Sequence, residues 1–325
     1  MKLKKIKRMV AVGTAILMTL SLAGCGIGSD SVKLGAAGVG GGYYAFSNAF
    51  AQIASSEDED LDFEVKATAG STANIRLLSD GYVDMAIAQA DLVDAAYNGT
   101  GATDKKRYRG YSAVASLYTE ACQIVVRADS GIDSLDDLQG KKISVGEEES
   151  GTQRNAEQIL KMTGLVESLV DTVNLDYVDA ANELKSGQID AFFCTAGIQT
   201  SVIEELSKEC DVKLIGIDDK CRDRLKSVYG FYTDYTIPAG TYEGQTQDVV
   251  TLGVRAVLLA RDDMDEKIVE ELTGLLFEHA QDIQYSIALT VQIDESEAVK
   301  NVTIPFHDGA KAYYQKKGIE IPAEQ

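Results

Sequence analysis

A glycine-rich stretch near the amino end is the first part of the sequence whose residue types could do chemistry. Five glycines lie between Gly35 and Gly42, and Tyr43 and Tyr44 follow them at the start of a helix-like run. Because glycine has no Cβ, such a loop lets another group approach its backbone closely. Nucleotide phosphates are one group that glycine-rich loops bind, so the surrounding residues must be tested for that use.

The residues around this loop argue against a nucleotide. Gly40, Gly42 and Ala45 match the loose form of the dinucleotide fingerprint, which also needs an acidic residue at the end of the next strand. The next strand-like stretch, 63–67, is followed by Thr-Ala-Gly and ends without such an acid. No Lys-Ser or Lys-Thr pair follows the glycines, so the P-loop pattern is missing as well. We therefore expect no nucleotide and no other cofactor.

The same design, a strand followed by a short loop and a helix, occurs three more times. The loops read Gly-Ser-Thr at 70–72, Ser-Gly-Thr at 150–152 and Thr-Ala-Gly at 195–197. A single Ser or Thr at a helix start is an ordinary N-cap. Four such turns, two in each half of the chain, indicate instead a shared anion site, because helix amino ends and exposed N–H groups at strand ends favour negative charge.

The candidates for this site are small, hydroxyl and amide residues. Tyr43 could supply a wall and a hydroxyl, or simply pack at a helix start. Gln89, at a strand end, suits an amine or amide of a ligand, or could hold a loop. Asp91 could meet an ammonium group, but we expect it to cap the next helix. The candidate ligand-binding residues are Tyr43, Ser71, Thr72, Asn74, Gln89, Ser150, Gly151, Thr152, Thr195, Ala196 and Gly197.

Elements that alternate along the chain must position these turns. Short apolar stretches alternate with segments of helical periodicity, which predicts an α/β fold built on parallel sheets with helices on both faces. The expected strands are 32–36, 63–67, 85–88, 122–127, 142–145, 172–177, 191–194 and 212–217, and the expected helices include 45–54, 72–79, 153–162 and 200–207.

Two segments indicate an internal repeat. The stretches LLSDGYVDMAIAQ (77–89) and ELKSGQIDAFFCT (183–195) both pass from a helix end through glycine and Val-Asp or Ile-Asp into an apolar strand. Gly81 and Gly187 suit a helix C-terminus. The repeat predicts two lobes of one plan, although such connections are common enough to recur by coincidence. With only three prolines in the chain, we expect strands rather than a Pro-rich linker to join the lobes.

Composition and motifs exclude several other functions. The net charge of −20 argues against a nucleic-acid partner, which needs clustered Lys and Arg. The two histidines, His279 and His307, lie in no catalytic or metal-binding motif, so we expect neither an enzyme nor a metal site. Beyond Cys25, the cysteines form no CxxC or Cys/His cluster, and we expect free or buried thiols at Cys122, Cys194, Cys210 and Cys221.

The amino end predicts export. Five basic residues precede an apolar run and the sequence Leu-Ala-Gly-Cys, which is typical of a signal peptide at 1–24. The run is too short for a membrane span. A cysteine directly after Leu-Ala-Gly resembles the bacterial lipobox, which implies lipid on Cys25, a tether at 25–31 and an extracytoplasmic location. An uncleaved anchor is the alternative.

Several segments together resemble the TAXI family of solute-binding proteins, the receptors of one branch of TRAP transporters. They include GGYYAFSNAFAQI, TAGSTANIRLLSDGYVDMAIAQAD, ESGTQRNAEQIL, QIDAFFCTAG, YTIPAGTYEGQTQDVV and IPFHDGAKAYYQKKG, and the similarity runs from about residue 32 to 322. The resemblance implies a two-lobed, type II periplasmic-binding-protein fold with its ligand in the cleft between lobes. Lobe I would comprise 32–117 and 236–325, and lobe II would comprise 122–232.

The resemblance also implies a function. The protein would capture a small carboxylate-bearing solute, such as glutamate, glutamine or a related acid, and deliver it to TRAP membrane subunits. An ABC-importer lipoprotein and a ligand-sensing lipoprotein are the alternatives. Glu147, Glu148 and Glu149 make one loop more acidic than is usual in the family, which favours a ligand with an ammonium group, such as an amino acid.

Overall fold

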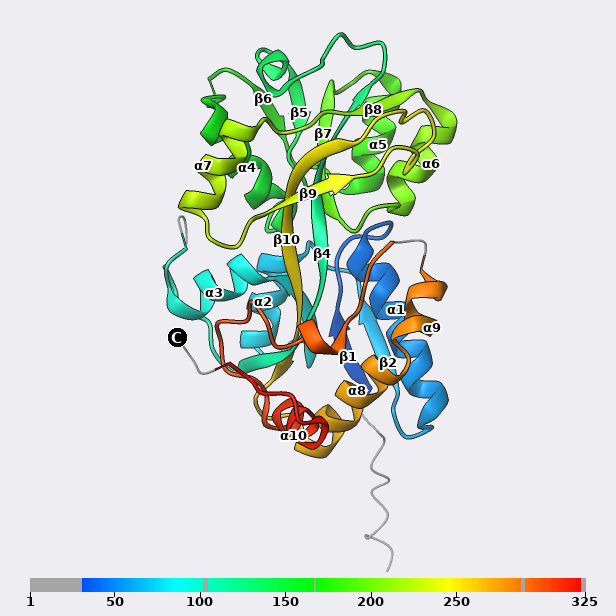
Figure 1. Cartoon of the computed structure of the whole chain (residues 1–325), viewed down its shortest axis with the longest axis vertical. Helices are drawn as coiled ribbons and strands as arrows, with labels where there is room; N and C mark the ends of the chain where they lie inside the picture. The colour runs from blue at the N-terminus through cyan, green and yellow to red at the C-terminus, as the bar shows by residue number, and fades with distance from the viewer. Residues whose placement is uncertain (1–30, 102–104, 167, 288–289, 323–325) are drawn as a thin grey trace, which may run out of the picture. The chain divides into compact units, whose positions relative to one another are not determined.

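Two long neighbouring strands form the centre of the structure. The computed structural model describes residues 31–101, 105–166, 168–287 and 290–322. Strands β4 (Tyr111–Arg127) and β10 (Val249–Arg261) pair antiparallel and run between the two ends of the sheet (Figure 1). Most residues of both strands are buried, as is typical of a strand covered on both faces. The expected signal peptide and Cys25 lie outside the described residues.

The other strands and the helices surround this central pair. The strands are β1 (Val32–Gly35), β2 (Phe63–Lys66), β3 (Met85–Gln89), β5 (Lys142–Ser144), β6 (Asp171–Val173), β7 (Ala191–Ala196), β8 (Val212–Leu214) and β9 (Thr233–Ile237). The helices are α1 (Gly42–Glu57), α2 (Ser71–Ser79), α3 (Ala90–Asn98), α4 (Gly151–Thr163), α5 (Tyr177–Ser186), α6 (Ser201–Glu209), α7 (Asp219–Val228), α8 (Glu266–Glu278), α9 (Ala280–Ser286) and α10 (Asp308–Lys317), with 3-10 turns at Leu135–Leu138 and Glu295–Glu297.

The sheet is mixed, which corrects the expectation of parallel sheets. Its order is β2-β1-β3-β10-β4-β7-β5-β6, with β8 on β4 and β9 on β10. The outer pairs β1–β2, β1–β3, β5–β6 and β5–β7 are parallel, but β10 pairs antiparallel with β3, and β4 with β7. Antiparallel neighbours need no crossover helix. The alternation of strands and helices therefore did not reveal β10, which was missing from the expected strands.

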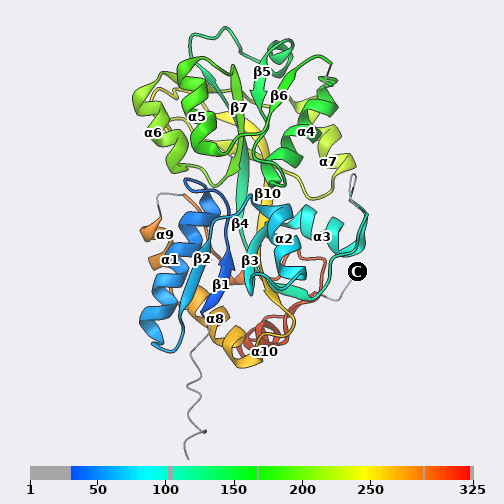
Figure 2. The ribbon, with the colours of Figure 1, turned by 180° about the vertical axis from the view of Figure 1, so that it is seen from behind.

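The apolar core is divided between the two ends of the sheet. One cluster includes Phe46 and Leu258, and separate clusters include Ile159 and Phe192. Helices α1–α3 and α8–α10 surround one end, and α4–α7 surround the other (Figures 1 and 2). Leu252, early in β10, packs in the same cluster as Ile159. The lobe boundaries remain a prediction. Because Leu252 packs in the cluster at the α4–α7 end, the first residues of β10 would belong to lobe II.

The segments expected to repeat have the same structure. We call residues 32–98 (β1–α3) the first repeat and residues 142–209 (β5–α6) the second repeat. In each, a left-handed glycine, Gly81 or Gly187, closely follows the helix, and an aspartate then precedes a fully buried strand. Asp84 accepts the N–H of Lys33 at 2.9 Å, and Asp190 accepts the N–H of Lys142 at 2.9 Å. The same carboxylate therefore joins neighbouring strands at the same place in both repeats.

The strand expected over 172–177 is wrong at its carboxyl end. β6 ends at Val173, and Asp176 caps α5 by accepting the N–H of Asp179 at 2.8 Å.

The histidine and cysteine side chains of the described residues have structural places. His307 caps α10 by accepting the N–H of Gly309. The cysteines at 122, 194, 210 and 221 are free thiols. Within the described ranges, no helix is both long and apolar enough to cross a membrane.

Candidate functional site

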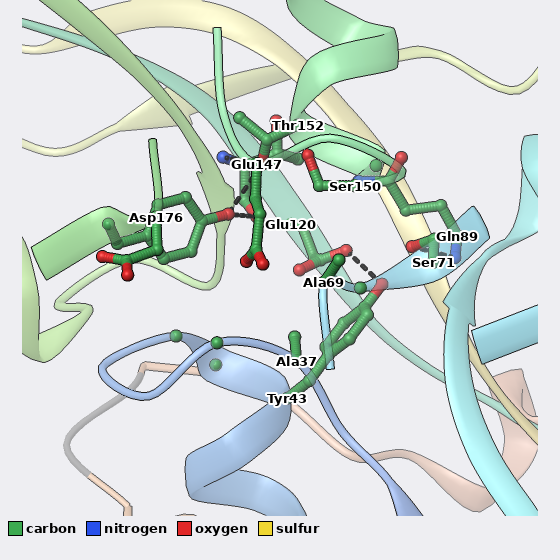
Figure 3. A pocket seen from close by; sticks show the side chains of 17 residues that line it. Ala37, Tyr43, Ala69, Ser71, Gln89, Glu120, Glu147, Ser150, Thr152 and Asp176 are labelled. Carbon is green, nitrogen blue, oxygen red and sulfur yellow. Dashed lines mark hydrogen bonds between the residues drawn. The ribbon is translucent and has the colours of Figure 1, made fainter. Parts of the chain in front are cut away.

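A pocket lies where the two repeats meet beside β4. Its empty space of about 490 Å³ includes open solvent. Its walls come from the starts of α1, α2, α4 and α5, from the ends of β3 and β7, and from β4 (Figure 3). Seven of the residues expected in a ligand site line it: Tyr43, Ser71, Gln89, Ser150, Gly151, Thr152 and Thr195.

The glycines of these loops let the two repeats approach each other as well as a ligand. A Cβ on Gly41 would lie 3.1 Å from the ring of Tyr177, and one on Gly151 would lie 2.5 Å from the amide carbon of Gln89. Gly70 has a φ of +117° and faces Ser150 across the pocket wall. The missing side chains of these glycines therefore make room for the opposite repeat as well as for a ligand.

Tyr43 and Glu120 form the floor of the pocket. The Tyr43 hydroxyl donates a hydrogen bond of 2.6 Å to Glu120, and their exposed fractions are only 5% and 2%. Burial raises the pKa of the Glu120 carboxyl to about 8, and hydrogen bonds from Tyr43 and Gln89 oppose part of that rise. Near neutral pH, Glu120 of the empty pocket is therefore mostly protonated.

Gln89 connects the repeats on one side of the pocket. Its backbone N–H donates to the Ser71 hydroxyl at 3.1 Å, and its Nε2 donates to Asn155 in α4 at 3.0 Å. Asn155 in turn donates to the hydroxyl of Tyr232 at 2.8 Å. The Oε1 atom of Gln89 is buried and has no hydrogen-bond partner. A buried acceptor without a partner is costly, so this atom is suited to a donor on a ligand.

Hydroxyl groups form the wall contributed by the second repeat. The Tyr177 hydroxyl donates to the carbonyl of Thr195 at 3.1 Å and lies 2.6 Å from the Thr152 hydroxyl. The N–H of Thr195 donates to the Thr152 hydroxyl at 3.2 Å. These three residues hold one another in place, which fixes the direction in which the wall faces.

Four expected site residues lie outside the lining of this pocket. Asn74 is fully buried and donates to the carbonyl of Ile87 at 2.8 Å, while its Oδ1 accepts the Thr68 hydroxyl at 2.7 Å. It therefore ties α2 to the strands. The N–H of Thr72 donates to the carbonyl of Glu149 at 3.1 Å. Ala196 pairs with β4, and Gly197 follows it. Ligand binding by these four, and by the residues that line the pocket, remains a prediction.

Several residues that line the pocket were not among those expected from the sequence. Glu120 carried a signal, since it is a lone acid inside the apolar run of β4. Tyr177 was assigned to a strand, so its place at a helix start was not foreseen. Asp176 and Glu147 complete the set of acidic side chains in the lining. Asp91 does not line this pocket but a neighbouring one, with Arg154.

The electrostatics of the pocket are acidic. Glu120, Glu147 and Asp176 line it, and burial raises the pKa of Glu147, with the charge of Asp176 adding to the rise. Among the residues that the structure describes, no lysine, arginine or histidine is part of the lining. The described residues also contain no cluster of His, Cys, Asp or Glu suited to hold a metal ion.

Polar contacts outside the pocket hold the two repeats together. Arg76 of α2 donates to both carboxylate oxygens of Glu149, at 3.1 and 2.6 Å. On the other side, the hydroxyls of Thr200 and Ser201 each donate to the carbonyl of Gly40 at 3.2 Å. Gly40 has a φ of +86°, which aims this carbonyl at the second repeat and favours glycine there. The two repeats are therefore held against each other on both sides of the pocket.

Solved structures show where this fold occurs. The chain is similar to a MatC protein from Rhodopseudomonas palustris with bound malate, with 14% identity, a TM-score of 0.58 and coverage of 82% of this chain and 91% of that one. A protein from Bordetella bronchiseptica shares 18% identity at a TM-score of 0.53, over 90% of this chain and 83% of that one. A putative L-cystine ABC transporter from Listeria monocytogenes shares 13% identity at a TM-score of 0.50, over 79% and 93%.

These similarities establish the fold, which is that of two-lobed periplasmic solute-binding proteins with a curled mixed sheet. The family is shown by a profile described as the NMT1-like family, which matches residues 34–318. Since that match covers most of the sequence, the chain belongs to the NMT1-like family.

Proposed function

We propose that this protein is an extracytoplasmic receptor that captures a small solute for a membrane transporter. The observation that carries this proposal is the pocket itself, whose walls come from helix starts and strand ends of both repeats. A solute that contacts both walls stabilises the closed arrangement, because only closure brings both sets of groups to the same molecule. The fold and the family support this function.

A carboxylate of the solute would be held by the first repeat. α1 and α2 begin after Gly41 and Gly70, and neither helix has a side-chain cap. The N–H groups of Thr72 and Ala73 in α2 already donate to the carbonyl of Glu149, at 3.1 and 3.2 Å. The first N–H groups of α1 and the positive dipole ends of both helices favour an anion. The hydroxyl of Ser71 lies at the same place. The substrate class that we propose is therefore a small carboxylate-bearing solute, such as glutamate, glutamine or a related amino or organic acid.

The type of transporter is the finer part of the proposal. The resemblance to the TAXI family favours TRAP membrane subunits as partners, with the lipid on Cys25 as the anchor to the cell membrane. The alternative is an ABC importer, which is the type printed for the similar Listeria monocytogenes protein. A receptor needs no catalytic group, and neither histidine nor cysteine is among the described residues that line the pocket. A permease gene of either type beside the gene for this chain would separate the two partners.

Thermal unfolding with a panel of amino acids and dicarboxylates tests the receptor function. A solute that binds the folded state alone stabilises it by about 2.7 kcal/mol at a concentration of about 100 times its Kd. We expect at least one compound to raise the melting temperature in a saturable way. The double variant Ser71→Ala, Thr152→Ala should weaken its binding at least about tenfold. A panel without any saturable shift would contradict the proposal.

A further inference from the structure

The charged side chains in the pocket all have the same sign. Glu120, Glu147 and Asp176 line it, and none of the described lining residues is basic. Each helix amino end supplies a partial positive charge of only about half a unit. A dicarboxylate would bring two more negative charges to this space. The lining therefore favours a solute that also carries a positive group.

Glu120 is the most buried acidic group of the lining. It is 2% exposed, and the charged side chain whose field acts on it, Asp91, is also acidic. Because burying a carboxylate is costly unless a positive group pairs with it, Glu120 stays mostly protonated in the empty pocket. A cation on the solute would supply the partner with which Glu120 can ionise. Figure 3 shows Glu120 directly above Tyr43, between the walls of the pocket.

Two further acceptors lie beside this carboxyl group. The Oε1 atom of Gln89 is buried without a hydrogen-bond partner. The hydroxyl proton of Tyr43 is already donated to Glu120, so the Tyr43 oxygen can only accept a further hydrogen bond. Glu120, Gln89 and Tyr43 thus offer three acceptors. A protonated amino group has three donors and one positive charge, which matches both the number and the sign.

From these contacts we infer that, within the receptor function proposed above, the solute carries a protonated amino group held by Glu120, Gln89 and Tyr43. The substrate class is then amino acids, whose carboxylate meets the starts of α1 and α2. Dicarboxylates without an amino group are excluded from this class.

Binding of such a solute is coupled to release of a proton. The pKa of Glu120 in the empty pocket is about 8, so an arriving ammonium group must displace its proton near neutral pH. Affinity therefore rises with pH up to about 8. Glu147 and Asp176 line the same pocket as Glu120. Among the described residues, the titratable groups whose pKa values are coupled to Glu120 are Tyr43, Asp91, Tyr118, Cys122, Tyr177 and Cys194. The phenols and thiols among them have raised pKa values and stay neutral, and Asp91, with a pKa of about 6, ionises earlier.

Matched pairs of compounds test the inference on the unaltered protein. L-glutamate against glutarate, and L-leucine against 4-methylpentanoate, differ only by the amino group. We expect isothermal titration calorimetry at neutral pH to show binding of at least one amino acid, about tenfold or more tighter than that of its deaminated partner. Equal or tighter binding of the deaminated partners would overturn the inference and leave the receptor function intact. Absence of binding by every compound would contradict the receptor function, and the inference with it.

A charge-matched pair of variants identifies the residue. Glu120→Gln keeps an acceptor for Tyr43 but removes the carboxylate, whereas Glu148→Gln removes one exposed charge from a neighbouring loop. We expect Glu120→Gln to lose at least about tenfold in affinity for the amino acid and Glu148→Gln to lose none. Titrations in buffers of different ionisation enthalpy should show proton release for the unaltered protein and not for Glu120→Gln. Undiminished affinity and proton release in a folded Glu120→Gln would exclude Glu120 as the acceptor.

Discussion

The two repeats have the same order of strands and helices but begin their helices differently. In the first repeat, α1 and α2 follow Gly41 and Gly70 and have no side-chain cap. In the second repeat, Ser150 caps α4 and Asp176 caps α5, each accepting an N–H of its own helix. The start of α1 therefore has no side chain over its N–H groups, whereas α2 already donates the N–H groups of Thr72 and Ala73 to the carbonyl of Glu149. The second repeat presents hydroxyl and carboxyl groups.

This difference gives the pocket a direction. The uncapped start of α1 favours an anion, whereas α4 and α5 have each satisfied one N–H group with a side chain of their own. Glu120 lies on β4 between the repeats, so it is available to a cationic group that reaches the floor. An amino acid would then lie with its carboxylate toward the first repeat. The variants below change one side of this comparison at a time.

The largest effect is expected where the repeats come closest. In Gly151→Val, the Cβ would lie 2.5 Å from the amide carbon of Gln89, so the repeats cannot close as they do here. Overpacking of this kind costs about 1–3 kcal/mol, which predicts about 5- to 150-fold weaker solute binding. Titration calorimetry measures the loss.

Gly230→Val is the matched control, because a Cβ there meets no atom within 4 Å. We expect it to bind like the unaltered protein. If Gly151→Val bound equally well, the closeness of Gly151 and Gln89 would have no part in solute binding.

Tyr43 and Tyr177 offer the next comparison, because Tyr43 donates to a carboxyl group and Tyr177 to a backbone carbonyl. Tyr43→Phe removes the hydrogen bond to Glu120, and Tyr177→Phe removes one to the carbonyl of Thr195. Each loss should lower the free energy of unfolding by about 1–3 kcal/mol. Urea unfolding at several pH values measures both losses.

The pH dependence separates these two variants. The pKa of Glu120 is about 8 in the folded protein against an ordinary value of 4.5. Between these values the folded state binds more protons than the unfolded state, so the contribution of Glu120 to stability falls as pH rises. Tyr43→Phe removes a hydrogen bond that favours the ionised form of Glu120. The loss of unfolding free energy in this variant should therefore grow as the pH approaches 8, where Glu120 begins to ionise. The loss in Tyr177→Phe should not change over this range. Equal pH profiles would contradict the role given to Glu120.

Much of this arrangement could be predicted from local patterns, and the reasons are physical. Ser71, Thr152 and Gln89 stand at helix starts or strand ends, and short elements of an α/β sheet bring such ends together. The repeat was visible because Gly81 and Gly187 are needed at equivalent helix ends. An asparagine at position 74 could equally contact a ligand, so its residue type alone was not decisive. In the structure Asn74 is buried, and its amide group donates to the backbone carbonyl of Ile87.

The remainder depends on contacts between distant segments. Glu120 gains its raised pKa from burial, which a sequence pattern does not record. Tyr177 reaches the pocket only because α5 starts where a strand was expected. β10 was missed because its neighbours are set by antiparallel pairing with β3 and β4. Gln89 and Ala256, for example, pair across 167 positions of the sequence. Pairings over such separations leave no local periodicity.

The helix caps give a smaller effect that tests the comparison directly. Ser150→Ala removes the acceptor for the N–H of Gln153, which lies 2.9 Å from the Ser150 hydroxyl. Loss of a serine N-cap costs about 0.5–2 kcal/mol of stability. Ser55 lies within α1, away from its start, so Ser55→Ala is the control. If both variants lost the same stability, the cap by Ser150 would have no energetic meaning.

The smallest effect is expected at the ion pair that joins the repeats outside the pocket. Arg76 and Glu149 have side-chain exposures of 39% and 41%, so solvent screens their attraction, which should be worth about 0.2–1 kcal/mol. Because the pair bridges the repeats, Glu149→Gln should weaken closure and lower solute affinity about 1.5- to 5-fold. Glu204→Gln removes a pair of similar exposure with Lys208, but within α6 alone. Glu204→Gln should lower the free energy of unfolding by a similarly small amount and leave the solute affinity unchanged. An equal loss of affinity in both variants would show that charge in general, rather than the bridge between the repeats, sets the affinity.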